Sequence, residues 1–290
     1  MVFQRVLLEL LFTETPMSNA KPPILLLSKP GMGKTFSLKN IKPELGNRTL
    51  LINCDSKPLS WVGNTAFKVY SAPCPTLIPA IIKKAGDSGD FDLIIVDTIT
   101  VAMAEYTRRF INTEMPKYAF NKDDQIVSDR NYVSTSAKLG GIVDSMANWG
   151  KYAALVSEIV AEGSKCKAQF VMMGHLNSRE DEGGEFIYKC PLQGQIGKQG
   201  LEGLFSIVMH ATTLPLEKLT GEYNQEHKYL GTEESLEFTG ERFVFQVAHT
   251  KDTIHSHALR TIQGLWPDGV RFIDNDLQMV FDRFDEVYKA

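Results

Sequence analysis

The chain has 290 residues, of which 43% are hydrophobic and 23% are charged, and its formal net charge is −4. This composition is ordinary for a globular protein, and it excludes a disordered chain, a collagen-like repeat and a disulfide-stapled miniprotein. The balance of 31 basic and 35 acidic residues also excludes a uniformly basic nucleic-acid coat. Any contact with nucleic acid therefore needs a local patch or a surface built by several subunits.

The N-terminal segment, residues 1–16, carries apolar residues at helical spacing, interrupted by Arg5 and Glu9. We interpret it as a short amphipathic segment or as an extension upstream of an ordinary start at Met17. No apolar run approaches the roughly 20 residues that cross a bilayer, so we expect no membrane partner. The four cysteines lie far apart and form no CxxC pair, which favours reduced thiols in a cytoplasmic protein over a metal site or a disulfide framework.

Strands and helices are expected to alternate along the first two thirds of the chain. Short apolar runs predict strands at 23–28, 49–54, 90–97 and 169–174, and a weaker strand is expected at 67–70. Helices are expected at 34–45 and 77–85, from about residue 100, and at 138–162, whereas residues 111–135 are polar and irregular. This alternation predicts an α/β fold with a mostly parallel sheet flanked by helices.

The last third has a different pattern. Strands are expected at 205–212, 237–238 and 242–249 without long helices between them, and a final helix at 277–288. We interpret this part as an antiparallel C-terminal extension of the same sheet. No internal repeat and no Ser/Gly-rich linker is visible, which favours one domain over residues 17–290.

Residues 28–35 form the central motif. They match the phosphate-binding pattern G-x-x-x-x-G-K-[ST], except that Ser28 replaces the first glycine. An apolar strand precedes the motif and a helix is expected after it, so backbone N–H groups and the helix dipole would converge on phosphate oxygens. Lys34 should reach the β- and γ-phosphates, and the Thr35 hydroxyl should bind Mg²⁺. The motif predicts an ATP site, as opposed to a merely structural turn, that comprises Pro30, Gly31, Met32, Gly33, Lys34, Thr35 and Phe36.

An acidic residue at the end of a buried strand completes such a site. Asp97 follows the apolar run 93–96 and is expected to be the Mg²⁺-directed Walker B acid; the alternative is an ordinary aspartate at a strand end. ATPases of the AAA+ type usually place a glutamate directly after this acid, but Thr98 stands there. This difference points to another branch of the P-loop ATPases.

A further strand ends at Gly174-His175. A polar side chain at this position can reach the γ-phosphate and signal its presence to the following loop, residues 176–190. His175 is therefore a candidate catalytic residue. The alternative is a histidine whose hydrogen bonds are satisfied at the strand end.

The order of these motifs resembles that of phage RecA-like ATPases, the AAA-type ATP-binding proteins encoded beside single-strand annealing and recombination genes. The resemblance covers about residues 20–288 and implies a RecA-like P-loop core. Besides the P-loop, Asp97 and Gly174-His175, the segments that carry it are Lys57-Pro-Leu59, Gly194-Gln-Ile-Gly-Lys198, Glu202-Gly-Leu-Phe205 and Ile273-Asp-Asn-Asp-Leu277.

The resemblance implies two more catalytic residues. RecA-like ATPases carry the water-activating acid at the end of the strand after the P-loop helix. Asp55 stands there, one methylene shorter than the usual glutamate, and a structural ion pair with Lys57 is the alternative. The family's Lys-Ser-Pro-like segment before the final strand corresponds to residues 259–266, where Arg260 takes the place of the lysine and the proline is missing. Such a cation points into the neighbouring subunit's ATP site in relatives that form filaments or rings; a surface or salt-bridged arginine is the alternative.

The resemblance implies a Mg²⁺-dependent ATPase that acts with single-stranded DNA in recombination, annealing or replication. The implied setting is a bacterial host's cytoplasm, with a ring or filament of identical subunits and other phage recombination or replication proteins as partners. Basic and aromatic residues at 106–110 and 117–120 could stack on bases and contact phosphates, but a helix with solvated arginines explains the first cluster equally well. A loader ATPase that acts on a protein without touching DNA is the main alternative. A metabolic kinase is disfavoured because no Arg-rich lid is visible.

Overall fold

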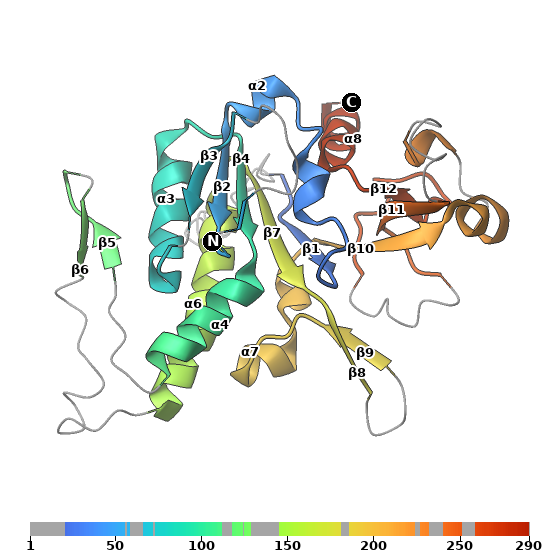
Figure 1. The fold of residues 1–290 in the computed structure, drawn as a ribbon. Helices are drawn as coiled ribbons and strands as arrows, with labels where there is room; N and C mark the ends of the chain where they lie inside the picture. Colours follow the sequence, from blue (N-terminus) through green and yellow to red (C-terminus); the bar gives the residue numbers. More distant parts are fainter. Residues whose placement is uncertain are drawn as a thin grey trace, which may run out of the picture.

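The computed structural model describes residues 21–55, 57–58, 66–71, 73–111, 118–123, 125–128, 145–180, 186–223, 227–231, 240–250 and 259–289. The main sheet is built from β1 (Ile24–Ser28), β2 (Thr49–Asn53), β3 (Lys68–Ser71), β4 (Leu93–Asp97), β7 (Gln169–His175), β10 (Ile207–Pro215), β11 (Glu241–Gln246) and β12 (Phe272–Asp274). These eight strands lie in the order β12-β11-β10-β1-β7-β4-β2-β3 (Figure 1).

All strands from β3 across to β10 run parallel to their neighbours, and β11 and β12 continue the sheet in antiparallel orientation. The predicted α/β fold class, a mostly parallel sheet flanked by helices with an antiparallel C-terminal extension, is confirmed. One detail of the prediction is wrong, because the strand expected at 205–212 is β10, which pairs parallel with β1. The long connection from β7 to β10 returns the chain to the edge of the sheet at which β7 begins, because β10 runs in the same direction as β7 and β1.

Helices cover both faces of the sheet (Figure 1). The α-helices are α2 (Pro43–Gly46), α3 (Ile78–Ser88), α4 (Ile99–Phe110), α6 (Ser145–Lys165), α7 (Gly194–Gln199) and α8 (Leu277–Lys289). The short helical turns are η1 (Thr35–Leu38), η2 (Pro75–Leu77), η3 (Leu201–Leu204), η4 (Lys218–Glu222) and η5 (His227–Tyr229). No helix in the described ranges has the length and apolar character needed to cross a bilayer.

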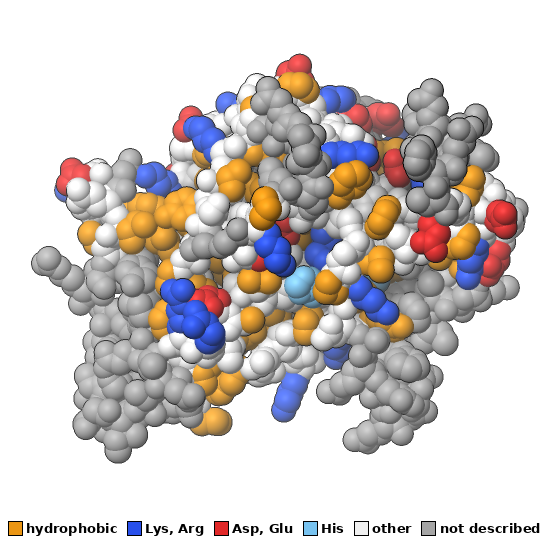
Figure 2. Space-filling view, in the orientation of Figure 1, with side chains coloured by type: hydrophobic (Ala, Val, Ile, Leu, Met, Phe, Trp, Pro, Cys, Tyr) orange, Lys and Arg blue, Asp and Glu red, His pale blue; other side chains and the backbone are white. Residues whose placement is uncertain are grey.

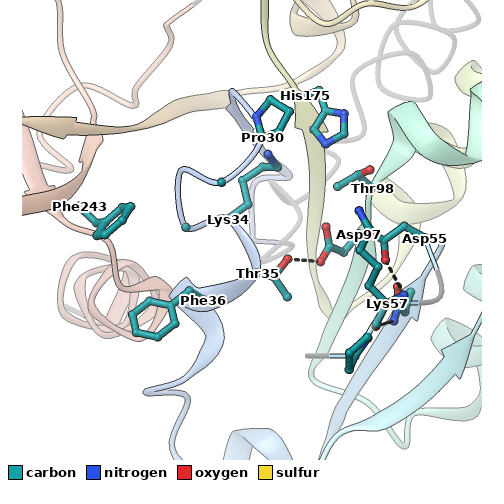
Figure 3. Close-up of a pocket in the computed structure, with 14 residues that line it drawn as sticks. Pro30, Lys34, Thr35, Phe36, Asp55, Lys57, Asp97, Thr98, His175 and Phe243 are labelled. Carbon is teal, nitrogen blue, oxygen red and sulfur yellow. Dashed lines mark hydrogen bonds and ion pairs between the residues drawn. The ribbon is translucent and has the colours of Figure 1, made fainter. Parts of the chain in front are cut away.

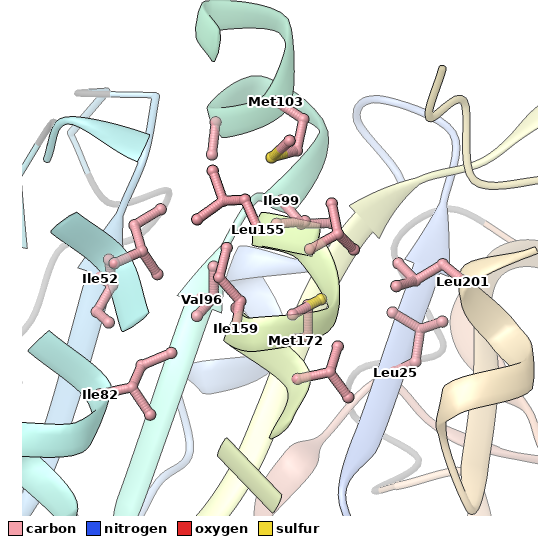
Figure 4. Packing of buried hydrophobic residues seen from close by; sticks show 14 of the residues in the cluster. Leu25, Ile52, Ile82, Val96, Ile99, Met103, Leu155, Ile159, Met172 and Leu201 are labelled. Carbon is pink, nitrogen blue, oxygen red and sulfur yellow. The ribbon is translucent and has the colours of Figure 1, made fainter. Parts of the chain in front are cut away.

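Alternate residues of each buried strand pack into two separate hydrophobic layers. In β1, Leu25 and Leu27 belong to the cluster that includes residues of α3, α4 and α6, part of which is drawn in Figure 4. Ile24 and Leu26 belong to the cluster on the opposite face, together with the apolar side of α8. Because side chains alternate along a strand and both faces are covered, the strands have the continuous apolar sequences that made them recognisable.

The structure corrects three local predictions. The helix expected at 34–45 is divided into η1 and α2, because Pro43 lacks an N–H group and its ring would clash with the preceding turn of a continuous helix. The irregular stretch 111–135 contains a hairpin of β5 (Tyr118–Phe120) and β6 (Ile126–Ser128). The loop expected at 176–190 contains a second hairpin of β8 (Asn177–Glu180) and β9 (Phe186–Lys189).

Other predictions were made for segments outside the described ranges. Residues 1–16, with the boundary at Met17, the strand at 237–238, and the first residues of the helix expected from 138 all lie there. The part of that helix that the structure describes is α6, which continues to Lys165.

Candidate nucleotide-binding site

The carboxyl ends of four parallel strands meet at one edge of the sheet and place the predicted site residues together. The P-loop follows β1, Asp55 follows β2, and Asp97 and His175 end β4 and β7. Their residues line one cavity of about 430 Å³, shown in Figure 3. Ligands bind at this edge in open α/β sheets. The full lining is Pro30, Gly31, Gly33, Lys34, Thr35, Phe36, Asn53, Asp55, Lys57, Pro58, Asp97, Thr98, His175 and Phe243.

Two glycines shape the P-loop turn. Gly31 and Gly33 have φ values of 81° and 78°, in the left-handed region that favours glycine. A Cβ atom at position 33 would also lie 2.4 Å from Nδ2 of Asn275, so the turn has no room for a larger residue there. The motif's glycine at position 33 is therefore required by backbone conformation and by close packing.

Lys34 is buried at the base of the cavity. Its Nζ donates to Oγ of Ser28 at 2.7 Å and to the Ser28 carbonyl at 3.3 Å. Ser28, which replaces the first glycine of the motif, thus supplies a hydroxyl that holds the ammonium group. Burial lowers the pKa of Lys34 to about 8, although the nearby Asp97 carboxylate acts in the opposite direction. An anionic phosphate in the cavity would stabilise the charged ammonium.

The side chains of Thr35 and Asp97 contact each other in the cavity. Oγ1 of Thr35 donates a hydrogen bond of 2.6 Å to Oδ2 of Asp97, which is also buried. Burial raises the pKa of Asp97, the hydrogen bond from Thr35 lowers it, and Asp55 nearby raises it further. A hydroxyl and a carboxylate are hard oxygen ligands that fit Mg²⁺, which typically binds through one or two carboxylates and the phosphates of its substrate. Within the described ranges, no group of three or more His, Cys, Asp or Glu side chains could hold a metal ion by itself.

Asp55 lines the cavity and is also paired with Lys57. Nζ of Lys57 lies 3.2 Å from Oδ2 of Asp55, and the Lys57 backbone N–H donates to Oδ1 at 3.1 Å. The Lys57 side chain is 77% exposed and that of Asp55 is 27% exposed, so solvent weakens the ion pair. The geometry therefore brings the predicted general base to the cavity and also shows the ion pair that was its alternative explanation.

His175 is half-buried at the end of β7. Its backbone N–H donates to Oγ1 of Thr100 at 3.3 Å. Burial lowers the pKa of His175 below the usual 6.5, and repulsion from Lys34 and Lys57 acts in the same direction. The imidazole is consequently neutral at pH 7. Figure 2 shows a histidine near the middle of this face, with basic and hydrophobic side chains around it.

Two predicted residues lie elsewhere. Met32 does not line the cavity, and its carbonyl instead accepts a hydrogen bond of 3.3 Å from Nδ2 of Asn275. Arg260 is exposed, and its backbone pairs with Val208 of β10. It lines a different cavity, of about 440 Å³, together with Phe205 and others. Arg260 therefore does not reach the P-loop of its own chain, and its donation to a neighbouring subunit stays a prediction.

Five residues that line the cavity were not predicted as site residues, although two of them, Lys57 and Pro58, belong to the family-like segment 57–59. Asn53 ends β2 and donates to the Lys57 carbonyl at 2.8 Å, and Thr98 follows Asp97 directly. Asn53 and Thr98 lie at strand ends that the sequence had already identified, and this position is the signal that could have predicted them. Phe243 comes from β11, and no motif marks it; only its exposure between the buried Arg242 and Val244 distinguishes it.

The basic and aromatic residues at 106–110 form an ordinary amphipathic helix face. Tyr106 and Phe110 are buried in the core, so they cannot stack on bases. Arg108 and Arg109 are exposed and both pair with Glu105. The expected stacking role of this cluster is wrong, and the alternative of solvated arginines on α4 is confirmed. In the second cluster, Lys117 and the side chain of Tyr118 lie outside the described residues.

The sequence from residue 20 to 243 matches the family described as AAA domain. Among solved structures, the chain is similar to one described as the crystal structure of the RadB recombinase. That similarity has 10% sequence identity and a TM-score of 0.34, and it covers 67% of this chain and 76% of that chain. No curated protein matches the sequence significantly.

Proposed function

Because the chain belongs to the AAA domain family, we propose that it is a Mg²⁺-dependent ATPase that binds the triphosphate of ATP in the P-loop cavity. The observation that carries this proposal is the meeting of Thr35 and Asp97, at 2.6 Å, beside the buried ammonium of Lys34. A cation, a hydroxyl and a carboxylate in one cavity at the carboxyl ends of parallel strands are the groups that a metal-bound triphosphate requires.

Different residues of the cavity bind the phosphates, hold the metal ion and activate the attacking water. Lys34 exchanges its bond to Ser28 for phosphate oxygens and neutralises their charge. Thr35 and Asp97 would hold Mg²⁺, which would supply further neutralisation of the phosphate charge. Asp55 accepts a proton from the attacking water, and Lys57 keeps this carboxylate oriented. The neutral imidazole of His175 can donate a hydrogen bond from its ring N–H to an oxygen of the terminal phosphate.

Phosphate release by the purified protein, with Mg²⁺ or with excess chelator, tests this proposal. We expect release only with Mg²⁺. The matched control for substitutions at Lys34 is Lys83→Ala, which removes an exposed lysine of α3 that pairs with Asp87. Phosphate release in the presence of chelator at the rate seen with Mg²⁺ would rule out the proposed metal dependence.

We propose that the ATPase acts with single-stranded DNA in recombination or annealing, as an assembly of identical subunits in the cytoplasm of a bacterial host. The resemblance of the C-terminal segments, such as Ile273–Leu277, to the phage proteins supports this process. ATP turnover with and without an oligonucleotide tests it. Oligonucleotide binding should weaken steeply as salt is raised, because neutralised phosphates release counterions.

One observation favours the alternative of a loader ATPase that acts on a protein partner without touching DNA. The aromatic residues of α4 are buried and its arginines already pair with Glu105, so this helix offers no stacking surface for bases. Under the alternative, ATP turnover is unchanged by oligonucleotide and no salt-sensitive binding is measured.

A further inference from the structure

Two aromatic side chains from distant parts of the chain line the P-loop cavity at one end. Phe36 belongs to η1 and Phe243 to β11. Figure 3 shows both on the side of the P-loop away from Asp97, Asp55 and His175. We propose that Phe243, assisted by Phe36, is the platform on which the base of a bound nucleoside triphosphate stacks. This proposal rests on the proposed binding of ATP.

The direction in which the triphosphate lies follows from the other residues of the cavity. Thr35 and Asp97 are the candidate Mg²⁺ ligands, and Mg²⁺ bridges the β- and γ-phosphates in P-loop enzymes. Asp55 lies near Asp97, so the reacting phosphate lies on that side of the P-loop (Figure 3). The α-phosphate, and with it the nucleoside, must extend toward the opposite side. Phe36 and Phe243 are the aromatic residues lining the cavity there.

Phe243 is held firmly but its ring is accessible. It is 43% exposed, whereas its neighbours in β11, Arg242 and Val244, are buried. Its carbonyl accepts a hydrogen bond of 3.2 Å from the backbone N–H of Asn275, and its Cδ1 atom lies 3.3 Å from where a Cβ of Gly33 would stand. An exposed aromatic ring on a strand, directly beside the phosphate-binding turn, is a surface for a planar partner.

Phe36 contributes less than Phe243. Nζ of Lys39 lies 4.2 Å from the centroid of the Phe36 ring, so one of its faces is already covered by a cation. Loss of Phe243 should therefore weaken ATP binding more than loss of Phe36. Stacking recognises the ring of any base rather than its hydrogen-bonding edge, so the platform favours nucleoside triphosphates over inorganic tripolyphosphate.

Equilibrium binding of ATP and of inorganic tripolyphosphate, each with Mg²⁺, tests this inference. Phe243→Ala should weaken ATP binding about 10-fold, as expected for the loss of one base-stacking contact. Its affinity for tripolyphosphate should stay unchanged. Tyr288→Ala is the matched control, because Tyr288 is an exposed aromatic residue on α8, 55% exposed, that does not line the cavity. This control should bind both ligands like the wild type.

A second variant keeps the test independent of stability. Phe243→Trp should retain ATP affinity, and its added indole fluorescence, measured against the wild type, should change with ATP and not with tripolyphosphate. The platform is overturned if Phe243→Ala binds ATP as the wild type does, or if its affinities for both ligands fall equally. Failure of the wild type to bind either ligand would overturn the proposed ATPase itself, together with the platform.

Discussion

The hydroxyl of Thr35 and the carboxylate of Asp97, 62 residues apart in the chain, are joined by a hydrogen bond of 2.6 Å. Thr35 begins η1 directly after the P-loop, and Asp97 ends β4, which is separated from β1 by β7. The parallel sheet brings them together because the carboxyl ends of its strands share one edge. Their contact joins the phosphate-binding turn to the strand-end acid, and the ATPase proposal depends on it.

Replacement of Asp97 by asparagine should separate activity from stability. Burial raises the pKa of Asp97, so its stabilising contribution is present below its ordinary pKa and is lost as pH rises through the raised value. At pH 7, Asp97→Asn should therefore leave the melting temperature unchanged or higher. ATP turnover should fall about 100-fold or more, because the amide binds Mg²⁺ poorly. A variant that melts lower and still turns over ATP normally would contradict this role.

Asp55→Asn should bind ATP normally but hydrolyse it slowly. Removal of a general base spares ground-state contacts and typically costs 10²- to 10⁴-fold in rate. Lys57→Met is the companion variant, and it should reduce turnover only slightly, since the Lys57 side of its ion pair with Asp55 is largely exposed to solvent. Single-turnover hydrolysis and ATP affinity are the measurements. Normal hydrolysis by Asp55→Asn would assign water activation to another residue.

Nucleotide binding should take up a proton at alkaline pH. With a pKa of about 8, Lys34 is mostly neutral at pH 9 in the free protein and mostly protonated at pH 7. The triphosphate favours the charged ammonium, so ATP binding should take up most of a proton at pH 9 and almost none at pH 7. Calorimetry in buffers of different ionisation enthalpy measures this uptake. Equal uptake at both pH values would place the titrating group elsewhere.

The sequence predicted most of the fold and the half of the site that is built from local motifs. Continuous apolar runs identified the buried strands, and their ends located Asp55, Asp97 and His175, because a parallel sheet gathers those ends. Periodicity was less informative where tertiary context decided the structure. Phe243 joins the cavity only because β11 pairs beside β10, a long-range relationship that no local pattern encodes.

Some errors had local causes that could have been recognised. Pro43 marks the end of the helix expected at 34–45. Tyr106 and Phe110 are four residues apart, and so lie on one face of α4, which is the core-facing side. The two hairpins, β5–β6 and β8–β9, were missed because their strands are too short to show a clear alternation.

Arg260 gives a prediction about assembly. It is exposed and does not line its own chain's P-loop cavity, so a catalytic role requires a second subunit. Specific ATPase activity should then rise with protein concentration. Mixing the inactive variants Lys34→Ala and Arg260→Ala should restore activity at about a quarter of the interfaces in a random mixture, where an intact P-loop meets an intact Arg260. No activity above that of either variant alone would make Arg260 a structural residue.

The most direct test of the central claim is Mg²⁺-dependent phosphate release by the purified wild type, Lys34→Ala and the control Lys83→Ala at equal concentration. Lys34 is the buried cation of the cavity, whereas Lys83 is an exposed lysine of α3. We predict steady turnover by the wild type and by Lys83→Ala, and a loss of about 100-fold or more in Lys34→Ala, because a preorganised charge at the phosphates is removed. Turnover by Lys34→Ala at the wild-type rate would contradict the assignment of this cavity as the site of ATP hydrolysis.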